Sequence, residues 1–170
     1  KILKRGYYPE GEGEIVVEIN PRYNINSSDS FAQLGETIQK EVPVIDLVEQ
    51  GTLEQIKGVV NVAAALQEQR VAERIQQAAE VSLRKHKVLT AIRVEYAQAK
   101  SIGGEILLWA VFSNLKKEGD FNLVILAGDA LIEKGKPTEK VATEAVEELE
   151  QEIKSGAAVD HHLADQLIQF

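Results

Sequence analysis

The stretch Glu105–Phe112, EILLWAVF, decides the fold, together with the similar run Phe121–Ala127, FNLVILA. Both runs are nearly all apolar and show no helical period, which is typical of short buried strands. A strand with one face in water would alternate apolar and polar side chains, so these runs predict central strands covered on both faces. Strands of this kind need covering layers, and the rest of the sequence has to supply them.

Further strand candidates precede this pair along the sequence. The β-branched run IKGVVNV at Ile56–Val62 and the alternating segment VLTAIRVEY at Val88–Tyr96 both predict strands. Nearer the N-terminus, Ile15–Ile19 alternates, and VPVIDLVEQG at Val42–Gly51 has the composition of a second extended piece. The glycine that ends this piece, Gly51, marks a junction between two units.

Two amphipathic helices are predicted to cover the strands. The first spans Ala64–Leu83. Its apolar side consists of Val71, Ile75, Ala78, Ala79 and Leu83. The second opens at Pro137 or Thr138 and closes with Lys154 and Gly156. Its apolar stripe consists of Val141, Ala145, Leu149 and Ile153. Strands and helices are therefore interspersed, which predicts an α/β fold, an α+β arrangement with a mixed sheet.

Composition and charge exclude several classes of protein. The 170 residues, 44% of them hydrophobic, suffice to bury a core, and a net charge of −8 means that polyanions are not attracted overall. The absence of cysteine excludes disulfides, thiolate zinc sites and thiol redox chemistry, and it fits a reducing cytoplasm. No apolar run approaches the ~20 residues of a membrane span, so we expect a cytoplasmic protein without membrane contact. The chain opens on Lys1 and contains no methionine, which predicts that it is part of a longer polypeptide.

The last residues, Val159–Phe170, read VDHHLADQLIQF and predict the first turns of a helix that Asp160 caps. Asp165 follows His161 by four positions and His162 by three, so either pair has the spacing to face one metal ion. The chain contains one other histidine, and catalytic zinc usually takes three protein ligands, so we expect no metal centre here. Either histidine has the chemistry of a general base, but the sequence offers no partner nucleophile. The alternative without a site is a polar helix start that Asp160 caps.

Two stretches resemble the RNA 3′-terminal phosphate cyclase family, in particular its archaeal type. RGYYPEGEGEIVVEI at Arg5–Ile19 is similar to the family's glycine-rich segment GYYPxGGG, with Glu12 where a glycine is usual. GAAVDHHLADQLIQF at Gly156–Phe170 is similar to its segment VDxxLADQL. The middle of the chain fits the family's inserted small domain, which has four strands and two helices in a thioredoxin-like layout. The resemblance spans the whole chain but only the later part of the family's length.

The resemblance implies a division of the chain into three parts. Residues 1–50 would be the end of a core repeat of the βαβαββ type. Residues 51–155 would be the inserted thioredoxin-like domain. Residues 156–170 would start the helix with which the chain returns to the core.

The resemblance also implies an ATP-dependent reaction on RNA 3′-phosphate ends. In the family, a histidine attacks the α-phosphate of ATP and forms a covalent adenylate, and the AMP then passes to the RNA 3′-phosphate. The neighbouring 2′-hydroxyl closes a 2′,3′-cyclic phosphate, assisted by a divalent metal ion, Mg²⁺ or Mn²⁺. The nucleophilic histidine follows the DQL segment, so we expect it beyond Phe170. The chain then holds no catalytic residue, and by itself it is expected to be inactive.

Three residues of the C-terminal helix inherit a nucleotide-binding role by resemblance. The family's ring-stacking tyrosine corresponds to His162, and its acid and amide correspond to Asp165 and Gln166. An imidazole can stack on adenine, although it offers less area than a phenol ring. The adenosine pocket would be completed by core segments that lie outside this chain.

Two alternative functions remain open at the level of sequence. One is a cyclase-like protein that processes or scaffolds ribosomal RNA without adenylyl transfer. Retention of Asp165 and Gln166 favours the enzyme over this alternative. The other is an interaction module built around the thioredoxin-like domain, in which the lack of cysteine excludes redox work.

Overall fold

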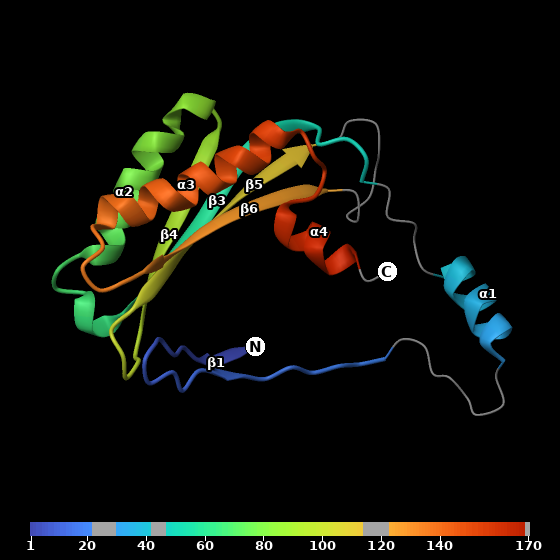
Figure 1. The fold of residues 1–170 in the computed structure, drawn as a ribbon, viewed down its shortest axis with the longest axis horizontal. Coiled ribbons are helices and arrows are strands. Elements are labelled where there is room, and N and C mark those ends of the chain that lie inside the picture. The colour runs from blue at the N-terminus through green and yellow to red at the C-terminus, as the bar shows by residue number, and fades with distance from the viewer. Residues whose placement is uncertain (22–29, 42–46, 114–122, 169–170) are drawn as a thin grey trace.

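The computed structural model describes residues 1–21, 30–41, 47–113 and 123–168. Its main body is a four-stranded sheet with two helices packed on one face (Figure 1). The strands are β3 Thr52–Ala63, β4 Leu89–Ala97, β5 Gly104–Ser113 and β6 Val124–Ile132, in the order β4-β3-β5-β6. The pair β3 and β4 is parallel, whereas the other two pairs are antiparallel. The predicted α/β fold with a mixed sheet is confirmed.

The helices α2 Val71–Leu83 and α3 Thr138–Ser155 cover the sheet. Helix α2 belongs to the crossover that parallel pairing requires between β3 and β4, and α3 follows β6. The body thus contains the four strands and two helices that the family resemblance implied. In the described part of the chain, no helix is long and apolar enough to cross a membrane.

The core lies between the two helices and one face of the sheet. Alternate residues of the strands point into it, and one stripe of each helix closes it. The largest fully buried side chains are Phe112, Ile56, Ile75, Leu83, Ile106, Leu108, Leu126, Leu149, Val60, Val62, Val124 and Val141. The predicted helix stripes are confirmed, because most of their members are buried and Ala78 and Ile153 pack against the core.

The opposite face of the sheet is open in the described structure. Leu107 on β5 is 39% exposed, and Ile125 and Leu131 on β6 are 47% and 57% exposed. The first apolar run, in β5, is a central strand as predicted, but the prediction is wrong for the second run, and neither strand is covered on both faces within the described residues. Both helices of the body lie on one face, and β6 is an edge strand. The second run is apolar throughout because its side chains are apolar both on the face that packs on the core and on the face that is uncovered in the described structure.

The helix boundaries agree with the sequence at α3 but not at α2. Helix α3 begins at Thr138 after Pro137, and Gly156 ends it in the left-handed conformation, as predicted. The predicted start of the first helix at Ala64 is wrong, because a short 3₁₀ turn, η1 Ala64–Leu66, comes first. Arg70 then adopts a left-handed conformation with φ of 51°, so the regular helix starts only at Val71. A second 3₁₀ turn, η2 Arg84–His86, follows α2.

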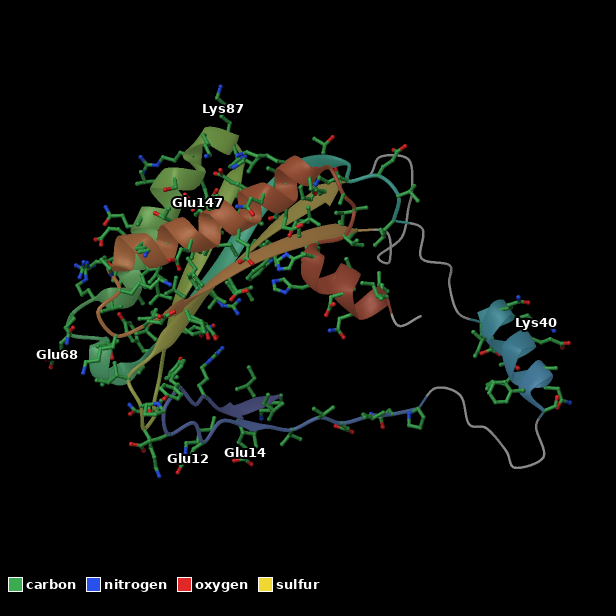
Figure 2. All side chains as sticks on the ribbon, in the orientation of Figure 1. Glu12, Glu14, Lys40, Glu68, Lys87 and Glu147 are labelled. Atoms are coloured by element: carbon green, nitrogen blue, oxygen red, sulfur yellow. The ribbon has the colours of Figure 1, made fainter. Side chains whose placement is uncertain are left out.

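The N-terminus forms a small hairpin of β1 Ile2–Lys4 and β2 Glu14–Ile15. The predicted strand at Ile15–Ile19 is thus much shorter than expected. Glu12, labelled in Figure 2, replaces the family's usual glycine at a φ of 61° and receives hydrogen bonds from two lysines. A positive φ is uncommon outside glycine, so the backbone here keeps the conformation that glycine favours.

The hairpin docks on the body through an ion pair. Arg5 Nη1 donates to Glu105 Oε1 at 2.6 Å. Gly103 allows close approach there, because a Cβ at this position would lie 2.6 Å from Tyr7 Cβ.

One helix was not predicted at all. Helix α1 Phe31–Glu41 starts with a capping box, in which Gln33 N donates to Ser30 Oγ and Ser30 N donates to Gln33 Oε1. None of its residues is buried. The extended piece predicted at Val42–Gly51 lies partly outside the described residues, and its described part, 47–51, is not a strand.

Candidate functional site

Helix α4, His161–Leu167, carries the residues that the sequence singles out, and it lies beside the free edge of β6 (Figure 1). The carboxylate of Asp160 fixes this position by accepting two hydrogen bonds. Its Oδ1 accepts from Leu163 N at 2.8 Å and caps the helix, as predicted. Its Oδ2 accepts from Ala127 N at 3.0 Å, which satisfies an edge N–H of β6. One buried acid therefore both starts α4 and ties it to the main body.

The predicted nucleotide-binding residues, His162, Asp165 and Gln166, are all exposed on α4. Residues three and four apart lie on one side of a helix, so His162 is a neighbour of both others along the surface. The apolar residues Leu163 and Leu167 of the same helix are 41% and 51% exposed. Within the described residues, the side of α4 that carries these two leucines is therefore not covered.

The structure adds an acid–histidine cluster that the sequence did not reveal: Asp129 of β6, Glu148 and Glu152 of α3, and His161 and His162 of α4. Figure 2 shows side chains of α4 projecting toward β6. His161 Nδ1 lies 2.5 Å from Glu152 Oε1, and His161 Nε2 lies 3.6 Å from Glu148 Oε1. His162 Nε2 lies 3.7 Å from Asp129 Oδ1 and 3.9 Å from Glu148 Oε1. The two rings overlap, with centroids 3.8 Å apart.

The cluster favours a positive charge. The hydrogen bond to Glu152 is the main cause that raises the pKa of His161 above its usual 6.5. The charges of Glu148 and Asp160 act in the same direction. Because the folded pKa is raised, this contact stabilises the folded protein fully below pH 6.5 and loses its effect as pH rises through the raised pKa.

Three members of the cluster have the arrangement of metal ligands. Among the described residues, one ligand atom each from Glu148, His161 and His162 lies within 4.8 Å of the others, and Asp165 is not part of this group. Helical spacing in the sequence pairs each histidine with Asp165 as a possible metal ligand, because Asp165 follows His161 by four positions and His162 by three. The third donor instead comes from α3, which only the tertiary fold brings to α4.

Comparison with known proteins gives the same family as the sequence resemblance. Residues 48–154 match the family described as RNA 3′-terminal phosphate cyclase (RTC), insert domain. Relatives named RNA 3′-terminal phosphate cyclase include those of Pyrobaculum neutrophilum, 33% identical, Pyrococcus abyssi, 34% identical, and Archaeoglobus fulgidus, 30% identical.

These alignments cover 100% of this chain and 41–42% of each relative, so the chain spans less than half the length of the proteins it matches. The matched insert region contains β3 to β6, α2 and α3, which is the unit that the structure shows as its main body. The chain therefore belongs to the RNA 3′-terminal phosphate cyclase family.

Proposed function

We propose that these residues are part of an ATP-dependent RNA 3′-phosphate cyclase, which acts in the cytoplasm. The observation that supports this proposal is the similarity of the whole chain to relatives of that name, through the insert and on into α4. In the proposed reaction, a histidine of the protein displaces pyrophosphate from ATP and retains AMP. The RNA 3′-phosphate takes the AMP, and the adjacent 2′-hydroxyl then attacks that phosphate and releases AMP.

Within this reaction, we assign helix α4 to the binding of adenosine. His162 would stack on the base, while Asp165 accepts hydrogen bonds from hydroxyl or amino groups and Gln166 adds an amide. All three side chains are exposed in the described structure, so none of them is buried against the insert. The remaining walls of the pocket would come from core segments outside these 170 residues.

The chemistry itself is assigned to residues beyond this chain. The nucleophilic histidine is proposed to follow Phe170, so the 170 residues alone would not form an adenylate. A divalent ion, Mg²⁺ or Mn²⁺, would offset negative charge on the phosphates of ATP during transfer. No residue of this chain is assigned to hold that ion.

The same proposal gives each part of the chain a place in the longer protein. Residues 51–155 would be the inserted domain, residues 1–50 the end of a core repeat, and residues 156–170 the return to the core. Exposed apolar side chains outside the insert support this division, since Ile19 is 80% exposed and Leu167 is 51% exposed. Core segments of the same protein would cover these side chains.

An end-conversion assay tests the proposed function. The protein at the length of its relatives would be incubated with ATP, Mg²⁺ and RNA that carries a labelled 3′-phosphate. We expect the label to become resistant to phosphatase, with release of AMP, because a cyclic phosphate has no free monoester. RNA with a 2′-deoxy terminal nucleotide is the matched control, and it should remain phosphatase-sensitive after removal of AMP.

A different result would favour the alternative function. If the protein binds RNA but the 3′-phosphate stays phosphatase-sensitive with every divalent ion, the cyclase assignment is wrong. A cyclase-like protein that processes or scaffolds ribosomal RNA would then be the better description.

A further inference from the structure

We propose that Glu148, His161 and His162 bind a transition-metal ion of the Zn²⁺ type, at the junction between the insert and helix α4. The site joins α3 to α4, two elements that the chain connects through the turn at Gly156. It is not implied by the cyclase reaction, and its tests use the metal ion alone. His162 is shared with the proposed nucleotide site, but metal binding and RNA cyclisation are measured separately, so failure of one proposal is distinguished from failure of the other.

The distances fit a three-ligand centre. In a tetrahedral zinc site with bonds of about 2.0–2.1 Å, ligand atoms lie about 3.3–3.4 Å apart. The Nε2 atoms of His161 and His162 lie 3.6 and 3.9 Å from Glu148 Oε1. Contraction by a few tenths of an ångström would bring each imidazole to the spacing required with the carboxylate. The ligand atoms of the two imidazoles lie within 4.8 Å of each other, so side-chain rotation of these exposed histidines would close the third separation. The fourth position is left for water or for Asp129, whose Oδ1 lies 3.7 Å from His162 Nε2.

The surroundings orient two of the three ligands in the way that metal centres require. A histidine ligand usually donates its second ring N–H to a carboxylate, which fixes its tautomer and orientation. His161 makes this contact with Glu152 through Nδ1, which leaves Nε2 for the ion. Glu148 is held through its other oxygen, since Oε2 accepts from Asp129 N at 2.6 Å.

Charge and exposure also favour a cation. Three carboxylates, those of Asp129, Glu148 and Glu152, face two imidazoles. Within the described residues, the ion pairs of Glu148 and Glu152 are with these histidines and not with lysine or arginine. The side chains of His161 and His162 are each 53% exposed, so an ion can reach the site from solvent. Imidazole donors select Zn²⁺, Co²⁺, Ni²⁺ or Cu²⁺ rather than Mg²⁺.

Titration with Co²⁺, followed by displacement with Zn²⁺, tests the site in protein that carries no histidine tag. We expect one Co²⁺ per chain, a visible absorption band that Zn²⁺ removes, and a rise in melting temperature with Zn²⁺, because the ion binds only the folded arrangement. Glu148→Gln and His161→Gln should each weaken binding by about tenfold or more, and Glu152→Gln, which removes the supporting contact, by about tenfold.

Two control variants are available in the same chain. Glu147, labelled in Figure 2, is an exposed neighbour of Glu148 on α3, and Glu147→Gln should leave Co²⁺ binding unchanged. His86 is the third histidine and pairs with Glu150 instead, so His86→Gln should also retain the band. The proposal is wrong if no band appears, or if the control variants weaken binding as much as the ligand variants. Melting temperatures without metal identify any variant that fails to fold. The ligand variants that do fold then show whether these side chains bind the ion.

Discussion

Gly128→Ala is expected to lower the free energy of unfolding of the insert by about 3 kcal/mol or more. A Cβ at this position of β6 would lie 2.4 Å from Leu149 N and 2.8 Å from Ala145 O. Both are backbone atoms of α3, so no side-chain rotation can relieve the clash. Helix α3 would have to move away from the sheet and expose the core, including Leu126, which is fully buried.

Urea unfolding measures this effect, and hydrogen exchange locates it. We expect amides throughout residues 51–155 to lose protection together, as one cooperative unit. Gly35→Ala is the matched control, because nothing lies within 4 Å of its added Cβ and alanine favours a helix. A variant Gly128→Ala as stable as the control would show that α3 does not pack on β6 in this way. Loss of protection confined to one strand would argue against residues 51–155 as a unit.

In the protein at the length of its relatives, Asp165→Ala is expected to reduce the use of ATP about tenfold or more. The carboxylate is proposed to accept hydrogen bonds from adenosine, and loss of one such contact in a closed pocket typically costs about 1–3 kcal/mol. The rate of adenylate formation at several ATP concentrations measures the change. Glu147→Gln, which removes an exposed carboxylate from α3, is the control.

The exchange His162→Tyr separates the nucleotide site from the metal site. A phenol ring offers more stacking area than an imidazole, so ATP use should be retained or improved. The same variant removes a proposed metal ligand, so Co²⁺ binding should weaken. If the ATP dependence of Asp165→Ala is unchanged, the assignment of adenosine binding to α4 is wrong, whatever the metal titration shows.

Local patterns predicted the insert well, where one rule dominated each element. Helix α3 has a proline at its start, a glycine at its end and one apolar stripe, and all of these signals agree with its observed bounds. The run at Ile56–Val62 lies inside β3, as its β-branched residues predicted. The start of α2 was missed because Arg70 takes a left-handed conformation, which its side chain does not signal. For α1, the capping box of Ser30 and Gln33 was a readable signal.

The open sheet face and the acid–histidine cluster depend on tertiary structure. An apolar run such as that of β6 does not distinguish a strand covered on both faces from an edge strand with one uncovered face. Helical spacing pairs His161 and His162 with Asp165 on the same helix, whereas the structure pairs them with Glu148 of α3. The predicted cap at Asp160 was correct, but its second contact with Ala127 of β6 needed the fold.

The position of the adenylate tests the central claim most directly. The protein at the length of its relatives would be incubated with ATP labelled on the α-phosphate, and the labelled peptide would be mapped. We predict one acid-labile AMP per protein, on a histidine outside Lys1–Phe170. AMP covalently bound to His161 or His162 would contradict the account. So would a protein that cyclises RNA ends without forming any adenylate.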